Sequence, residues 1–277
     1  MKKRYFLLVG FVLCLMLSFV CLFLGLKSFF IKPKTADFAP SRPVTATQNP
    51  TEESSVPNDN NKSDEKEDKC PVDFSSLKSI NSDIYAWIDV PGTNISYPVL
   101  QSKNDDTYYL NHDSDKSYNT NGAIFSEKEY NEKSFDDPVT VLYGHDMRSG
   151  DMFGQLQSDY SNEEFMKNNG EILIYTPERE LRYKIFAATP YYSLHLLYYY
   201  PFDKSYVFNQ FFDELYNYRT LSSTYLEEYK PYYGDKVLVL STCMNNGDNK
   251  RFLVMGVLNS FSCYDYCHDS HSCGSCI

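Results

Sequence analysis

The sequence has few basic residues for its length, and no cluster of them lies outside the N-terminal flank. Its 277 residues include 26 Lys and Arg against 37 Asp and Glu, a formal net charge of −11. A nucleic-acid-binding surface needs clustered lysine and arginine to neutralise phosphates. The composition therefore argues against nucleic acid as a partner.

The chain also lacks an internal repeat with a period of roughly 20–50 residues and an A-x-A-like cleavage site. An uncharged apolar run covers 22 residues, Tyr5–Leu26, and about 20 such residues span a bilayer core as a helix. Because no cleavage site follows, we predict an uncleaved signal anchor within residues 1–34. Three basic residues precede the run and three follow it, so charge alone leaves the orientation open.

Large apolar residues are almost absent from residues 35–69, which contain four prolines and many Ser, Thr, Asn, Asp and Glu residues. Such a segment cannot bury enough surface to offset the entropy of ordering it. We expect a disordered acidic tether, which at this length would hold the following domain about 30–35 Å from the anchor.

The remaining chain is rich in aromatic residues and in short β-branched runs, which favours a mainly β fold over a helical bundle. Tyr occurs 25 times and Phe 19 times in the chain. Short strands at modest spacing predict a closed or nearly closed β-barrel of about eight strands. The predicted strands are 85–90, 95–100, 122–126, 138–144, 171–176, 181–190, 236–242 and 251–258.

Two helices are expected around this barrel. Phe74, Leu77 and Ile80 recur at helical spacing, and Asp73 precedes them as a cap, so a short helix should precede the first strand. A longer helix is expected within 205–229, before the penultimate strand, because Phe208, Phe211, Phe212 and Leu215 fall on one helical face.

Few residues in this region suit nucleophilic chemistry. A thiol nucleophile needs a partner that promotes its thiolate, and acyl transfer needs a group that stabilises an oxyanion. Cys243 is the one cysteine at a predicted barrel strand, directly after 236–242, His145 follows a strand end and a glycine, and Arg251 opens the next strand. A core cysteine, a loop hydrogen bonder and a surface ion-pair former fit the same pattern, so the residues alone leave both interpretations open.

Five motifs in a fixed order resemble class B sortases, over residues 74–258. They read "GTNISYPVLQ", "YYLNHD", "GAIF", "LYGHDMRSGDMFGQL" and "VLSTC", the last followed by Arg251. The resemblance implies a sortase-type barrel spanning 70–261, in a membrane-anchored cysteine transpeptidase of Gram-positive bacteria, with the catalytic domain outside the cell facing the wall. One position departs from the family's T-L-x-T-C: Val239 replaces the first threonine, and Val and Thr have similar shape and strand preference.

By this resemblance, Cys243 is the nucleophile, His145 the general acid and base, and Arg251 the cation that stabilises the oxyanion. The implied reaction cleaves the sorting signal of a surface protein after a threonine through a thioester, and a peptidoglycan amine then resolves the thioester. No cofactor is implied. The substrate-binding residues that the resemblance suggests are Ser96, Leu100, Tyr143, Tyr198 and Ser241; barrel packing is the alternative for Leu100 and Tyr143.

The segment 262–277 lies outside the sortase pattern. It contains two histidines, His268 and His271, and four cysteines: Cys263, Cys267, Cys273 and Cys276. An unstructured or disulfide-linked tail, a metal site on these cysteines and a redox role all fit this composition. Cys70 is either a free thiol or a partner for one of them.

Two other functions remain open for the whole chain. A hydrolytic cysteine peptidase would give its acyl-enzyme to water, and a non-catalytic surface module would keep the barrel without the reaction.

Overall fold

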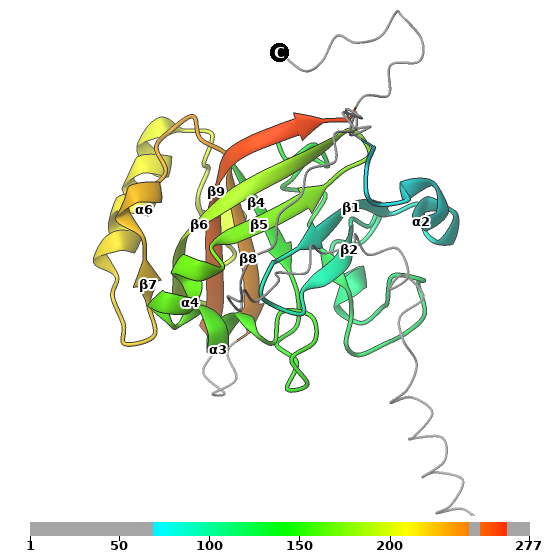
Figure 1. The fold of residues 1–277 in the computed structure, drawn as a ribbon, viewed down its shortest axis with the longest axis horizontal. Helices are drawn as coiled ribbons and strands as arrows, with labels where there is room; N and C mark the ends of the chain where they lie inside the picture. The colour runs from blue at the N-terminus through cyan, green and yellow to red at the C-terminus, as the bar shows by residue number, and fades with distance from the viewer. Residues whose placement is uncertain (1–68, 244–249, 265–277) are drawn as a thin grey trace, which may run out of the picture. The chain divides into compact units, whose positions relative to one another are not determined.

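The fold is a β-barrel. The computed structural model describes residues 69–243 and 250–264 of the chain. Figure 1 shows strands at the centre with helices at the periphery. The strands within the described ranges are β1 (Ile84–Asp89), β2 (Ser96–Leu100), β3 (Ile124–Phe125), β4 (Val139–Tyr143), β5 (Glu171–Tyr175), β6 (Arg179–Tyr192), β7 (Thr224–Tyr225), β8 (Val237–Cys243) and β9 (Lys250–Cys263).

Eight of these strands form a closed ring. The pairing order is β5-β1-β2-β3-β4-β8-β9-β6, and a further pairing between β5 and β6 completes the circle. At this seam Glu171 and Lys184 are directly opposite, and the Lys184 Nζ lies 2.6 Å from Glu171 Oε1, which adds a cross-strand ion pair to the backbone ladder. The prediction of a closed barrel of about eight strands is confirmed.

β7 is the strand that sequence patterns missed. It pairs with β6 through Ala187 and Ala188, and it lies outside the ring. Two residues are too few for a visible alternation of apolar and polar side chains.

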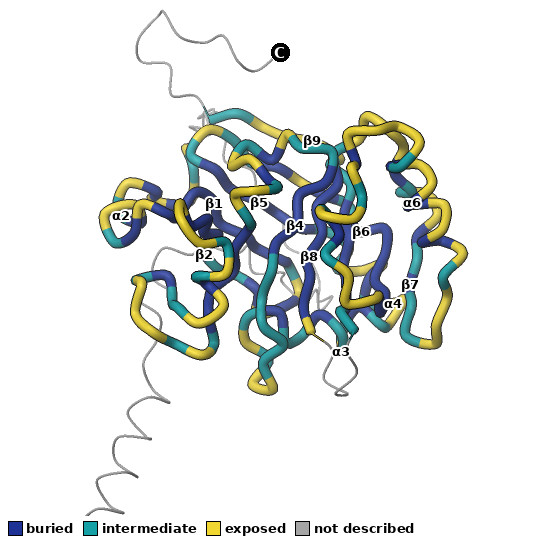
Figure 2. Tube along the Cα trace, turned by 180° about the vertical axis from the view of Figure 1, so that it is seen from behind, coloured by how far each residue is buried: buried dark blue, intermediate teal, exposed yellow. Residues whose placement is uncertain are grey.

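The core is divided into an interior and two outer clusters because strand side chains alternate between the two faces of the sheet. Figure 2 shows the buried strands at the centre of the molecule. The interior contains fully buried Leu142, Leu240 and Val254. One outer cluster lies beneath α6 (Ser205–Asn217) and includes Phe186 and Phe212.

The second outer cluster lies beneath α2 (Phe74–Ile80), which begins as predicted: the carboxylate of Asp73 accepts a hydrogen bond from Ser76 N–H at 3.1 Å. Phe74 and Leu77 pack there against Trp87. The predicted apolar face of α6 is also confirmed, since Phe208, Phe211, Phe212 and Leu215 are all buried.

α6 ends earlier than the predicted range of 205–229. The Thr220 N–H donates to Ser223 Oγ and the Ser223 N–H donates to Thr220 O, both at 3.1 Å. This hydroxyl-rich turn offers the backbone an alternative to helix. Sequence patterns also missed the short helices α3 (Leu156–Tyr160), α4 (Glu163–Asn168) and α5 (Leu196–Tyr199), and the 3-10 turns η2 (Tyr108–Leu110) and η3 (Glu227–Tyr229).

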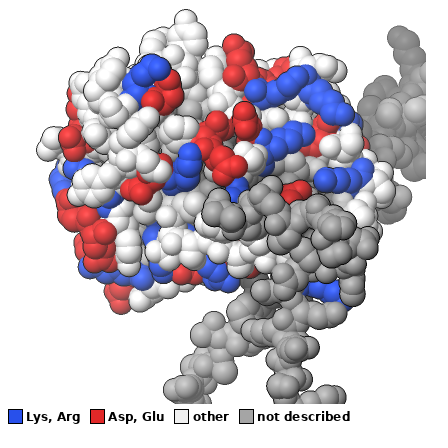
Figure 3. Space-filling model, turned by 90° about the horizontal axis from the view of Figure 1, so that it is seen from above, with Lys and Arg blue, Asp and Glu red and all other residues white. Residues whose placement is uncertain are grey.

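Charges of both signs are interspersed on the face seen in Figure 3. Within the described ranges, no helix is long and apolar enough to cross a membrane. The predicted anchor and nearly all of the predicted tether lie outside those ranges.

Candidate active site

Two parallel strands bring His145 and Cys243 to the same edge of the barrel. β4 and β8 pair in parallel with Tyr143 opposite Ser241, and Gly144 N–H continues the ladder by donating to Ser241 O at 3.2 Å. His145 and Cys243 each come two residues after that pair. Because neighbouring strands lie about 4.8 Å apart, the pairing places both residues at one end of the sheet.

Arg251 reaches the thiol through the next strand. β8 and β9 are antiparallel, with Cys243 directly opposite Arg251, and the guanidinium Nη1 donates a hydrogen bond to Cys243 Sγ at 3.2 Å. Cys243 is exposed. An exposed sulfur with a permanent cation beside it suits a reactive thiol better than a packed one.

The His145 ring is held by the backbone of a distant loop. Its Nε2 lies 2.7 Å from the carbonyl oxygen of Leu110. A carbonyl can only accept, so Nε2 carries the hydrogen and Nδ1 is the nitrogen left to take a proton. The backbone is also fixed, because His145 O accepts from Phe153 N–H at 3.0 Å.

Gly144 allows the chain to pass close to the core just before His145. A Cβ at this position would lie 2.5 Å from Ile124 Cδ1 and 2.7 Å from Phe153 Cδ2. Any side chain here would have to push aside the side chains of Ile124 and Phe153.

A cavity of about 100 Å³ is lined in part by Arg251, the partner of Cys243. Side chains alternate along a strand, so Ser241 and Cys243 lie on the same face of β8. Ser241 lines the cavity together with Tyr143 of β4 and Arg251 of β9. The remaining lining residues are Val141, Leu253 and the continuous segment Tyr191–Leu196. Arg251 thus borders both the cavity and the thiol.

Comparison with known proteins identifies the family. A model described as the sortase domain matches residues 88–259, more than half of the chain. The chain belongs to the sortase family. Sortase B of Listeria monocytogenes is 30% identical over 192 residues, which cover 67% of this chain and 74% of the relative.

Solved structures of class B sortases share this fold. A mutant form of Clostridium perfringens sortase B matches with a TM-score of 0.60 and 29% identity, covering 67% of this chain and 86% of the other. A Staphylococcus aureus sortase B–substrate complex matches with a TM-score of 0.57 and 27% identity, covering 68% and 84%. The resemblance to class B sortases is confirmed, and it supports a cysteine transpeptidase.

Of the five predicted substrate-binding residues of this sortase, two line the cavity and three do not. Tyr143 and Ser241 line the cavity beside Arg251. Ser96 and Leu100 lie on β2, where Ser96 Oγ accepts from the Trp87 indole at 3.1 Å and Leu100 is fully buried beneath α2. Tyr198 belongs to α5, and its side chain is 68% exposed. The structure thus brings two of the five to the cavity.

Sequence reasoning passed over a histidine and a carboxylate at this site. His195 lines the cavity, and its Nε2 lies 2.8 Å from Glu127 Oε2. Burial first, and then the charge and hydrogen bonding of Glu127, raise the pKa of Tyr143, so its phenol stays protonated. A carboxylate five residues after the "GAIF" glycine was the available signal, but no local pattern links it to His195.

The cysteines outside the site are partly described. Cys70 is a free thiol, and its S–H donates to Thr176 O at 3.6 Å. Cys263 is disulfide-bonded. Among described residues, no group of three or more His, Cys, Asp or Glu side chains could hold a metal; Cys267, Cys273 and Cys276 lie outside that part of the chain.

Proposed function

We propose that this sortase cleaves a peptide sorting signal after a threonine and transfers the acyl group from Cys243 to an amine of peptidoglycan. The observation that carries the proposal is the hydrogen bond from Arg251 Nη1 to Cys243 Sγ at 3.2 Å, at the strand edge that also bears His145. Thiol, imidazole and guanidinium are the three groups that acyl transfer by a cysteine requires.

In the first half of the reaction, Cys243 Sγ attacks the carbonyl carbon of the scissile peptide bond. The proton of the thiol goes to His145 Nδ1, the nitrogen that the Leu110 carbonyl leaves open. Arg251 stabilises the oxyanion of the tetrahedral intermediate. The intermediate collapses as His145 returns the proton to the leaving amine, and a thioester at Cys243 remains.

In the second half, an acceptor amine attacks the thioester carbonyl. His145 takes a proton from the attacking nitrogen, Arg251 again stabilises the oxyanion, and the C–S bond breaks as the proton on His145 passes to Cys243 Sγ. The product is a new amide, and the enzyme is regenerated. A thiolate–imidazolium pair and a neutral pair both fit this sequence of steps, because each delivers the same number of protons.

The cavity supports a peptide as the substrate. It is lined by tyrosine and aliphatic side chains together with polar groups, Ser241 and Arg251 among them, which suits the mixed apolar and polar surface of a peptide. A similar sortase B has been solved with a substrate. We therefore place the residues before the scissile bond in this cavity.

The cellular arrangement is part of the proposal. The apolar run Tyr5–Leu26 would anchor the chain in the membrane with its N-terminus inside the cell. Residues 35–69 would then let the catalytic domain reach the cell wall from outside.

The test uses full-length protein and a fluorogenic peptide library with threonine fixed at the cleavage position, with and without triglycine as the amine. Mass spectrometry should reveal a thioester on the tryptic peptide containing Cys243 and an amide product that requires triglycine. Cys243→Ala should form neither.

Two results would contradict the proposal. Hydrolysis at a rate and yield unaffected by the amine would identify a peptidase. The absence of any adduct at Cys243 across the library would favour a non-catalytic surface module.

A further inference from the structure

The carbonyl that holds His145 belongs to a long connection with little secondary structure of its own. β2 ends at Leu100 and β3 begins at Ile124, and the described chain between them contains the short turn η2, Tyr108–Leu110, and an isolated bridge between His112 and Tyr118. A loop of this length is mobile unless something fixes it. The orientation of the His145 imidazole therefore depends on what anchors Leu110.

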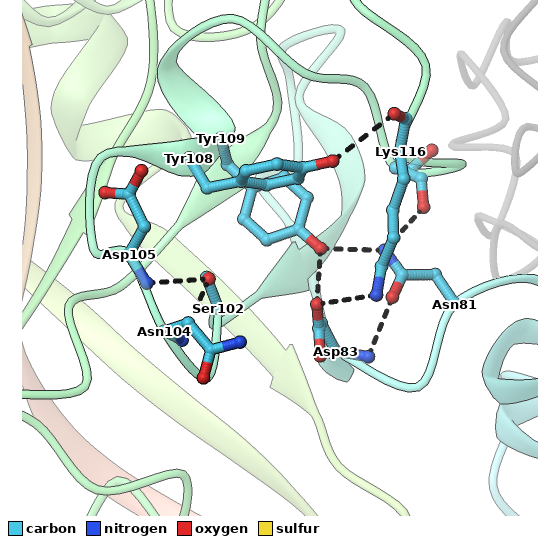
Figure 4. Close-up of polar contacts among 9 residues, drawn as sticks. Asn81, Asp83, Ser102, Asn104, Asp105, Tyr108, Tyr109 and Lys116 are labelled. Atoms are coloured by element: carbon cyan, nitrogen blue, oxygen red, sulfur yellow. Dashed lines mark hydrogen bonds and ion pairs between the residues drawn. The ribbon is translucent and has the colours of Figure 1, made fainter.

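A buried polar network anchors the residue next to it. The Tyr109 side chain is 1% exposed; its hydroxyl donates to Asp83 Oδ2 at 2.8 Å and accepts from Asn81 Nδ2 at 2.8 Å. Figure 4 shows the three side chains converging between the α2–β1 connection and the loop. Buried polar groups that satisfy each other in this way specify one arrangement, since breaking any bond strands a partner.

The same network also holds the middle of the loop. Lys116 Nζ lies 3.0 Å from Asp83 Oδ2, and Asn81 Nδ2 also donates to Ser114 O at 2.9 Å. Burial tends to raise the pKa of Asp83, but hydrogen bonds from Lys116 and Tyr109 outweigh it and the pKa is lowered. Asp83 is thus a carboxylate with loop partners on both sides of Leu110.

Close packing of the backbone at Gly122 also restricts the Leu110 carbonyl. Its φ is +59°, and a Cβ here would lie 2.8 Å from Leu110 O and 2.5 Å from Tyr109 O. The next residue, Ala123, donates its N–H to Tyr109 O at 3.0 Å. The backbone can pass this close to the Leu110 carbonyl only because position 122 has no side chain.

We propose that Asp83, Asn81 and Tyr109 form a positioning unit for His145, which acts through the Leu110 carbonyl to hold the imidazole in its Nε2–H tautomer. These residues do not touch the substrate. The inference rests on the proposed role of His145 for its catalytic consequence, and on contacts alone for its structural one. A loop without this unit would let the ring exchange between tautomers and turn away from the thiol.

Tyr109→Phe tests the unit, and Tyr108→Phe is the matched control. Both changes remove one hydroxyl from adjacent rings, but the partly exposed Tyr108 hydroxyl contacts only Lys116 O, at 3.4 Å. The full chain is labelled with ¹⁵N in histidine, and His145→Gln identifies the His145 signals. At a pH where the ring is neutral, we expect wild type and Tyr108→Phe to show one protonated and one unprotonated ring nitrogen, and Tyr109→Phe to show averaged signals.

Kinetics supply the second measurement. Misplacing a catalytic group costs about 10- to 100-fold in rate, so Tyr109→Phe should lower kcat for thioester formation by that factor, leave KM nearly unchanged and alter the pH–rate profile. Asp83→Asn and Gly122→Ala should act in the same direction, which keeps the test informative if one variant folds poorly.

The outcomes are separable. If Tyr109→Phe and Tyr108→Phe give the same ring signals, the positioning unit is refuted whatever the enzyme does. If wild type forms no thioester, the proposed function fails, and the ring signals alone decide the inference.

Discussion

His145 and His195 both follow barrel strands, yet their rings are held in different ways. Within the described residues, the His145 ring has one hydrogen-bond partner, the Leu110 carbonyl on Nε2. His195 uses both nitrogens: Nδ1 accepts from Tyr198 N–H at 3.1 Å, and Nε2 lies 2.8 Å from Glu127 Oε2. A ring whose two nitrogens are engaged has no position left for exchanging a proton with substrate.

The comparison shows that position relative to a strand does not decide a histidine's role. His195 lines the cavity and caps α5, so it shapes the site. His145 keeps one nitrogen available at the edge that bears the thiol. The hydrogen bonds that each ring nitrogen makes distinguish a catalytic histidine candidate from a structural one.

The largest expected effect is on catalysis, when each of the two histidines is replaced in turn. His145→Gln should lower kcat/KM for transpeptidation by about 10²–10⁴, the usual contribution of a general acid–base, whereas His195→Gln should lower it less than about tenfold. Steady-state kinetics with one peptide and one amine measure both. Equal losses would mean that His195 takes part in proton transfer.

Arg251 joins the two regions, because it contacts Cys243 and also lines the cavity with His195. Arg251→Lys keeps the charge but loses the guanidinium geometry, and we expect a loss of about 10²–10³ in kcat, as for an oxyanion donor. Single-turnover acylation measures this step. Full activity in the lysine variant would show that charge alone suffices.

A similar comparison applies to the reactivity of two free thiols, Cys70 and Cys243. Burial raises the pKa of the Cys70 thiol above its ordinary value of 9.0, so Cys70 stays protonated as pH rises to that value, while Cys243 is exposed. Iodoacetamide at pH 7.5 should label the peptide containing Cys243 at least about tenfold faster. Labelling of Cys70 should rise with pH but stay below half its maximal rate at pH 9, because its pKa lies above that value; faster labelling of Cys70 than of Cys243 at neutral pH would contradict this.

The smallest expected effect is on stability, where replacing His195 should matter more than replacing His145. His195→Ala removes a helix cap and a hydrogen bond to a carboxylate, which should lower the free energy of unfolding by ~1–2 kcal/mol. His145→Ala should lower it less, because this change removes the ring's hydrogen bond to the Leu110 carbonyl but no helix cap. Urea denaturation of both variants measures the difference, and a larger loss for His145→Ala would refute the structural role of His195.

Local sequence patterns predicted most of the barrel. All eight strands and the Asp73 cap follow from features within one segment, such as β-branched runs and a side chain three residues before its partner. What the patterns missed depends on distant partners. β7 exists because Ala187 and Ala188 offer it an edge, and α6 ends where a turn competes with the helix.

The candidate site was predictable only in part. Cys243, His145 and Arg251 could be named from the resemblance, and the strand register brings them to one edge. The Leu110 carbonyl, Glu127 and the buried Asp83 network left no signature, since each interaction joins residues more than 20 positions apart.

The parallel pairing of β4 with β8 has a consequence for folding. These strands are separated by nearly the whole C-terminal half of the domain, so the chain must complete a long crossover before the thiol and the imidazole can meet. Such distant pairings form late, after the entropy of closing the loop has been overcome. Only fully folded molecules should therefore become acylated at Cys243, and partly folded molecules should not react with the substrate.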